Sequence, residues 1–130
     1  MKHYYSFENL DVWKVSKQLV IQIYQLIEKF PKVEKYALCD QLRRACISIP
    51  SNIAEGSGRI SVKEKVHFIS IAYGSLMEVY CQLQIAVELR YIQDENIEEI
   101  YNLINKTSLL MTKYRDFLLN QEKDLNKKEA

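Results

Sequence analysis

Apolar residues recur at three- and four-residue steps along most of the chain, the spacing of an amphipathic helix. The stripes predict four helices, over about residues 11–29, 35–56, 62–90 and 95–120. Phe30-Pro31 ends the first helix, because proline disfavours helical geometry in the residue before it. Ser61 and Glu64 have the spacing of a capping box and start the third helix.

The second predicted helix carries a proline at position 50. Its stripe keeps one phase across that proline, through Leu38, Leu42, Ala45, Ile49 and Ile53. Proline removes one backbone hydrogen bond and crowds the preceding turn, so we expect a single helix kinked at Pro50. Beyond the fourth helix, residues 121–130 contain one large apolar side chain, Leu125, and we expect this tail to fray.

Three Gly and two Pro in 130 residues leave few places for turns, which favours long helices over a sheet. A chain of this length fits one domain, and its 48% hydrophobic and 27% charged residues are typical of a globular protein. Four helices with short connections pack most simply as an antiparallel up-down-up-down bundle. We therefore predict an all-α, single-domain four-helix bundle.

The third predicted helix has apolar residues outside its main stripe. Ile71, Ile85 and Leu89 lie on its polar side, and positions 71, 78 and 85 are seven apart, so the isoleucines align. An aligned apolar set suggests a second buried seam. We expect these three residues to lie in an interface between copies of the chain, and the alternative is a monomer with an apolar surface.

A polar seam follows one flank of the second helix, beside its apolar stripe, at Gln41, Arg44, Ser48, Asn52 and Glu55. Half-buried polar groups need partners, and Ser75, Glu78 and Gln82 of the third helix are candidates. Arg44 and Glu55 are about 16 Å apart along the axis, so we expect each to meet a neighbouring helix. The seam predicts interhelical hydrogen bonds that fix the register or, alternatively, a groove for a ligand or RNA.

The formal net charge of +1 argues against a strong, non-specific grip on nucleic acid. A local patch remains compatible with it. Lys35, Arg43 and Arg59 form a candidate phosphate-contacting patch, whose simpler interpretation is a solvated face.

No catalytic or metal centre is predicted. A di-iron bundle needs two Glu-x-x-His motifs; Glu64 and His67 match once, and the other histidine is His3. Cys39 and Cys46 have the wrong spacing for zinc and fit small buried hydrophobes. Gly74, in the middle of a helix, suggests close helix approach. We expect a cytoplasmic protein with free thiols, no cofactor, no membrane span and no enzymatic activity.

The string from Cys39 to Gly56 closely resembles one bacterial family, together with Phe30-Pro31-x-x-Glu34-x-Tyr36 before it and Ala72-x-Gly74-Ser75-x-x-Glu78 after it. Founding members of this four-helix-bundle family are encoded by intervening sequences inside 23S ribosomal RNA genes. The resemblance covers roughly residues 7–91, with the fourth helix agreeing in pattern only.

This resemblance implies an up-down bundle that assembles as a homopentamer. It also relates the chain to the accessory protein of diversity-generating retroelements, a strongly basic pentamer that binds nucleic acid and a reverse transcriptase. Our first hypothesis is a non-catalytic homo-oligomeric scaffold that presents a composite surface to RNA or a protein–RNA complex. The second is a protein-interaction adaptor without nucleic-acid contact, and the third is a small-molecule binder in the oligomer's central channel.

Overall fold

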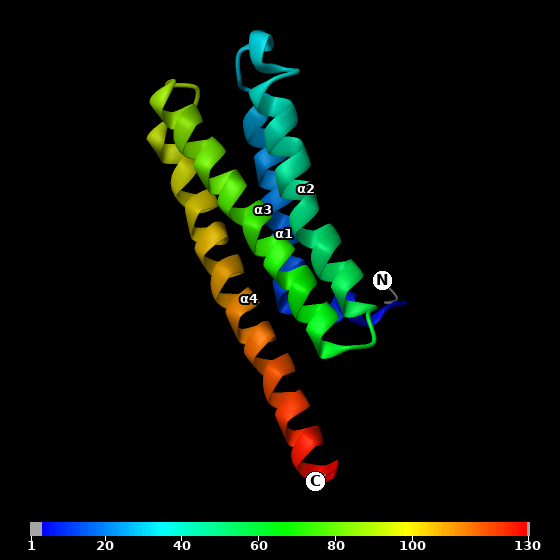
Figure 1. Cartoon of the computed structure of the whole chain (residues 1–130). Coiled ribbons are helices and arrows are strands. Elements are labelled where there is room, and N and C mark those ends of the chain that lie inside the picture. The colour runs from blue at the N-terminus through cyan, green and yellow to red at the C-terminus, as the bar shows by residue number, and fades with distance from the viewer. Residues whose placement is uncertain (1–3, 130) are drawn as a thin grey trace.

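The computed structural model describes residues 4–129 of the chain. Four α-helices and two short 3-10 helices follow one another in the order η1 (Ser6–Asn9), α1 (Asp11–Ile27), η2 (Lys32–Glu34), α2 (Leu38–Ser57), α3 (Val62–Glu88) and α4 (Asp94–Glu129) (Figure 1). The described part of the chain contains no strand. The prediction of an all-α four-helix fold is confirmed.

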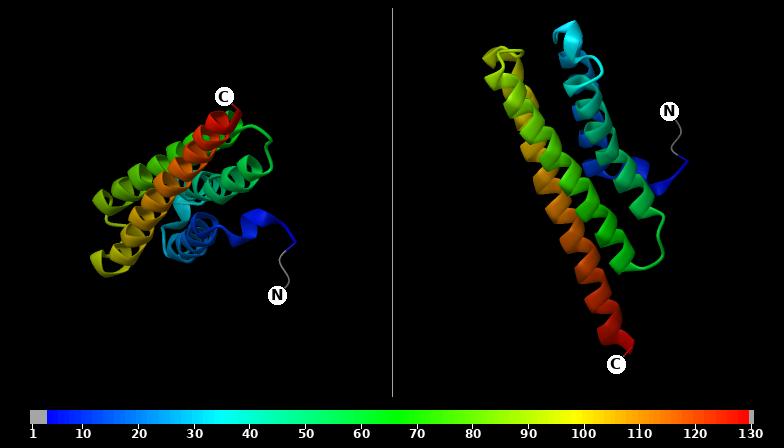
Figure 2. Two further views of the ribbon diagram at one scale, coloured as in Figure 1. Left: turned by 90° about the horizontal axis from the view of Figure 1, so that it is seen from below. Right: turned by 45° about the horizontal axis from the view of Figure 1, so that its top comes forward.

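Each long helix packs against two others. α1 and α3 both contact α2 and α4, whereas the diagonal pairs α1–α3 and α2–α4 make no close contact within the described residues. Successive helices run in opposite directions (Figures 1 and 2). This is the antiparallel up-down-up-down arrangement that short connections favour.

The core lies along the common axis of the four helices. The apolar side chains that are most completely buried come from all four helices, and include Leu19, Ile23, Leu42, Ile49, Ile53, Leu76, Val79, Leu83 and Met111. Their spacing within each helix is three, four or seven residues, which places them on one face of each helix. The apolar stripes of the sequence thus become the inner faces of the bundle.

The helix bounds differ from the expected ones mainly at α4. This helix continues to Glu129, although residues 121–130 were expected to fray, and it extends past the lower ends of the other helices (Figure 1). Leu118 is the last buried side chain of α4 among residues 95–128, whose burial the structure describes. Good helix formers fill the extension, and Lys127 and Lys128 lie in the last turn, where positive charge favours the helix. α2 is one continuous helix across Pro50, as expected.

The two ends of α3 have different caps. At the start, the Ser61 hydroxyl accepts a hydrogen bond from the Glu64 amide at 3.1 Å, which confirms that half of the predicted capping box. At the end, Arg90 has a φ of 63°, in the left-handed region. The amides of Arg90 and Tyr91 then bond back to the carbonyls of Val87 and Ala86, the pattern of a Schellman motif. An arginine replaces the usual glycine there, so the sequence did not signal this cap.

Candidate functional site

The centre of the predicted polar seam is a hydrogen-bonded link between α2 and α3. The hydroxyls of Ser48 and Ser75 are 2.8 Å apart. The Asn52 amide nitrogen donates to the Ser48 carbonyl at 2.7 Å and to the Ser48 hydroxyl at 2.9 Å. Either hydroxyl of the Ser48–Ser75 pair can be the donor. These three side chains satisfy one another and fix the register of the two helices.

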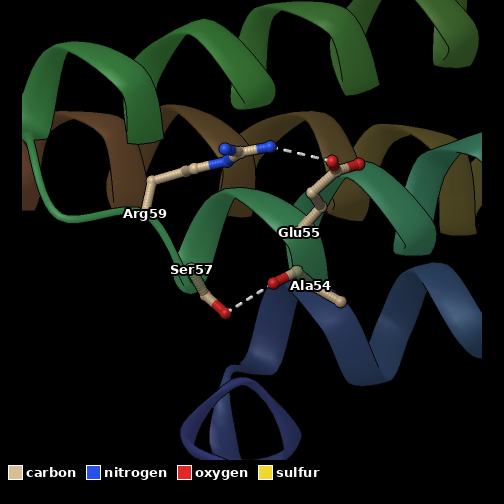
Figure 3. A network of polar contacts seen from close by, with 4 residues as sticks. All are labelled: Ala54, Glu55, Ser57 and Arg59. Atoms are coloured by element: carbon tan, nitrogen blue, oxygen red, sulfur yellow. Dashed lines mark hydrogen bonds and ion pairs between the residues drawn. The ribbon is translucent and has the colours of Figure 1, made fainter.

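The charged members of the seam do not join this link. Arg44 pairs with Asp40 one turn earlier in α2, with Nε 3.3 Å from the carboxylate, and Arg59 pairs with Glu55 at 3.0 Å (Figure 3). The expectation that Arg44 and Glu55 each meet a neighbouring helix is therefore wrong. Both have an opposite charge four residues away, which is close enough for a local pair. Exposed pairs of this kind contribute little to stability.

The C-terminal end of α2 is tied to the start of α3. Gly56 is buried, and a Cβ added to it would lie 2.6 Å from Cβ of Phe68. The Ser57 hydroxyl donates to the Ala54 carbonyl at 2.7 Å (Figure 3), and Lys65 donates to the Ser57 carbonyl at 3.2 Å. The Arg59 guanidinium lies over the Phe68 ring, 4.8 Å from its centroid. This end of the seam therefore has a structural role.

Gly74 does not have the role expected for it. A Cβ at this position would meet nothing within 4 Å, so Gly74 does not permit a close helix approach within one chain.

The apolar residues predicted for an interface lie at the surface of α3. Ile71, Ile85 and Leu89 are 38%, 47% and 51% exposed. Helical geometry places them on the flank of α3 that also carries Ser75, and hence next to the polar flank of α2. We call the combined surface the α2–α3 face. It comprises Gln41, Arg44 and Glu55 of α2 and Ile71, Glu78, Ile85 and Leu89 of α3.

One buried polar atom borders the α2–α3 face. Among the described residues, Oε1 of Gln82 is buried without a hydrogen-bond partner. Because Ser48 lies opposite Ser75 in an antiparallel pair, Gln82 comes level with Gln41, two turns back along α2. The α2–α3 face thus has exposed apolar side chains next to a hydrogen-bond acceptor, Oε1 of Gln82, that has no donor among the described residues.

The predicted phosphate-contacting residues are divided between the two ends of α2. Nη2 of Arg43 donates to the Lys35 carbonyl at 2.8 Å, which brings these two residues together. Arg59 lies just beyond the other end of α2, and the helix from Arg43 to Ser57 alone spans about 21 Å. The grouping of all three in one patch is therefore wrong. Lys35 and Arg43 instead line a pocket between α1 and α2, which we call the α1–α2 pocket.

Two of the three thiols are buried in the bundle. Cys39 donates to the Ile27 carbonyl at 3.8 Å, and Cys46 donates to the Arg43 carbonyl at 3.4 Å. Burial raises the pKa of Cys46 to about 11 and also raises the pKa of Cys39. At neutral pH a thiol with a raised pKa is almost entirely protonated, and the protonated form is a weak nucleophile. Both cysteines are core residues, as expected, and Cys81 is exposed.

The described residues contain no group of three or more His, Cys, Asp or Glu side chains that could hold a metal ion. His3, considered for a di-iron motif, lies outside them. No described helix is long and apolar enough to span a bilayer.

Most of the amino-acid sequence matches the model of a known family. A model of the family described as 23S rRNA-intervening sequence protein matches residues 8–113. The chain belongs to this family. The match covers α1, α2, α3 and the first part of α4, and it ends before the protruding end of α4. No curated protein matches the chain.

The family fold is also seen in a solved structure. The chain is similar to a protein of unknown function from the S23 ribosomal protein family of Bacteroides thetaiotaomicron, with a TM-score of 0.72 and 21% sequence identity. The similarity covers 80% of this chain and 97% of the other. At this identity the likeness supports the fold of the family member and nothing about its task.

Proposed function

We propose that this family member is a non-catalytic, homo-oligomeric helical scaffold in the cytoplasm that associates with RNA or a protein–RNA complex. The α2–α3 face is the proposed contact between copies. The family resemblance implies five copies. The observation that carries the proposal is the row of exposed aliphatic side chains at Ile71, Ile85 and Leu89 beside the polar flank of α2.

The total surface of the chain supports an assembly. Its solvent-accessible area is 8816 Å². A compact monomer of 15.4 kDa has about 7,200 Å². The end of α4, which continues past the buried part of the bundle, contributes to the excess. Exposed apolar surface, such as that of Ile71, Ile85 and Leu89, is characteristic of subunits that cover one another.

A second apolar surface supports a ring rather than a closed pair. Ile21 of α1 and Ile47 of α2 are exposed, and neither residue lies on the α2–α3 face. Copies that join through two different faces form a ring when the rotation closes. Contact between the α2–α3 face of one copy and the surface that carries Ile21 and Ile47 in the next would satisfy that geometry.

The proposed interface can be tested by placing charges in it. Ile71→Glu with Ile85→Glu should lower the assembled mass in light scattering while the helical circular dichroism is kept. The matched control is Val33→Glu with Ile60→Glu, which adds the same charges at exposed aliphatic residues in two turns. An unchanged mass for the first variant, or an equal loss of mass in both, would contradict the proposed interface.

The near-neutral charge of +1 favours the alternative, a protein-interaction adaptor without nucleic-acid contact. A gel shift with structured RNA over a range of salt separates the two. Real phosphate contacts release counterions, so their binding weakens steeply as salt rises. If no RNA binds at low salt, the association with RNA is contradicted and the adaptor is the remaining hypothesis.

A further inference from the structure

The α1–α2 pocket lies where α1 ends and α2 begins, on the opposite side of α2 from α3. Its volume is about 300 Å³. Tyr24, Phe30 and Pro31 supply apolar wall, and Lys32, Lys35 and Arg43 supply positive charge. Glu28 is the one acid among the described residues that line it. The pocket therefore joins an aromatic surface to a net positive rim.

The walls of the pocket are held in place by contacts outside it. Phe30 is buried, and its ring lies 5.6 Å from the ring of Tyr91. The Tyr91 hydroxyl in turn donates to Glu34 at 3.4 Å. The turn that carries Pro31 and Lys32 is thus anchored to the end of α3, so the cavity belongs to a packed part of the fold.

Arg43 is oriented toward the same turn. One of its N–H groups donates to the Lys35 carbonyl at 2.8 Å, and a guanidinium has five such donors. The remaining donors are available to an anion, and their fixed fork suits a phosphate. Lys32 and Lys35 are exposed and can add two further cationic groups.

We propose that the α1–α2 pocket binds one nucleotide unit, with the base against Tyr24 and Pro31 and the phosphate at Arg43, Lys32 and Lys35. A pocket of this size is at the small end of ligand sites, which suits one nucleotide rather than an extended cofactor. The unit is an unpaired nucleotide of RNA or a free nucleotide. The first source rests on the RNA association proposed above, and an unpaired base can enter a pocket that a duplex cannot.

The test compares two arginines in the full chain, Arg43 in the pocket and Arg115 on α4. Binding of a fluorescein-labelled single-stranded RNA of about 12 nucleotides is measured by anisotropy at several salt concentrations. Arg43→Gln should weaken binding about tenfold and lower the slope of log affinity against log salt by about 1. Arg115→Gln removes the same charge from a half-exposed residue of α4, outside both the pocket and the α2–α3 face, and should leave both quantities unchanged.

The aromatic wall of the pocket is tested with a matched pair of tyrosine variants. Tyr24→Leu keeps an apolar side chain but removes the stacking surface, and it should weaken binding about fivefold. Tyr73→Leu, at an exposed tyrosine on α3, should have no effect. If Arg43→Gln disturbs the helical circular dichroism, Lys32→Gln with Lys35→Gln replaces it, with Lys14→Gln and Lys63→Gln as the control.

A titration with uridine monophosphate distinguishes the two sources. Saturable binding that Arg43→Gln abolishes assigns the pocket to free nucleotides, and binding of RNA alone assigns it to RNA. Equal weakening by Arg43→Gln and Arg115→Gln would overturn the pocket while leaving an RNA-associated scaffold intact. Binding of neither probe at about 50 mM salt would overturn the pocket too. The assembled mass is measured separately, so failure of the scaffold is recognised independently.

Discussion

Gly56 of α2 lies directly against Phe68 of α3, so close that a Cβ on Gly56 would be 2.6 Å from Cβ of Phe68. Real Cβ atoms do not approach this closely, so one helix would have to move. Eight residues earlier in α2, the hydroxyl of Ser48 lies 2.8 Å from the hydroxyl of Ser75 in α3. The glycine therefore sets the spacing of the two helices at one end of their contact.

Gly56→Ala should reduce the free energy of unfolding by about 1–3 kcal/mol, because the added methyl overpacks a close contact. Gly74→Ala is the matched control, since it makes the same change in an open position on a helix. It should raise stability by about 0.5–1 kcal/mol, the cost of glycine in a helix. Urea unfolding of the two variants measures both. A neutral or stabilising Gly56→Ala would contradict the close approach.

The hydroxyl pair of Ser48 and Ser75 should behave as a coupled unit. Ser75→Ala should cost about 1 kcal/mol, the net contribution of a typical hydrogen bond. In a double-mutant cycle with Ser48→Ala, the coupling energy should be about 0.5–1.5 kcal/mol. Ser70→Ala, at an exposed position of α3, should stay within about 0.5 kcal/mol of the wild type. Strict additivity of Ser48→Ala and Ser75→Ala would show that the pair contributes nothing as a unit.

The bundle could be predicted from the sequence because local patterns decide it. The apolar stripes through Leu42, Ile49 and Ile53 became inner faces, and Ser61 caps α3 as its spacing indicated. The apolar stripe could not predict the extra length of α4, because the side chains of its last turns do not pack in the core. Helix propensity and terminal lysines govern that segment instead.

The candidate site was predicted only in part. Periodicity identified the flank that carries Ser48, Asn52 and Ser75, because side chains three or four residues apart share a face. It could not identify the partners of Arg44 and Glu55, since an exposed charge can pair within its own helix or across to another. The α1–α2 pocket was missed for a different reason. Lys32 and Tyr24 line the same pocket only because the turn between α1 and α2 brings them together. A turn has no hydrophobic periodicity from which this could be predicted.

The thiols should differ sharply in reactivity. Iodoacetamide at neutral pH should label the exposed Cys81, whereas the buried Cys39 and Cys46 should remain unlabelled until the protein unfolds. Peptide mass spectrometry with and without denaturant measures the three sites. Labelling of Cys46 in the folded protein at the rate of Cys81 would contradict its burial.

Cys46 should also add a pH dependence to stability. Its folded-state pKa is raised from 9.0 to about 11, so the native state retains a proton that the unfolded chain releases. The stabilising contribution is full below pH 9.0 and is lost as the pH rises through about 11. Unfolding free energies across this window should fall less steeply for Cys46→Ala than for the wild type. Parallel curves of unfolding free energy against pH for the two proteins would contradict the raised pKa of Cys46.

Self-association is the claim on which the scaffold depends, and the mass of the wild-type chain in solution tests it most directly. Sedimentation equilibrium at micromolar concentration should give a multiple of 15.4 kDa, and five copies of the chain weigh about 77 kDa. A single species of 15.4 kDa would show that Ile71, Ile85 and Leu89 face solvent in the working protein, and would contradict the scaffold.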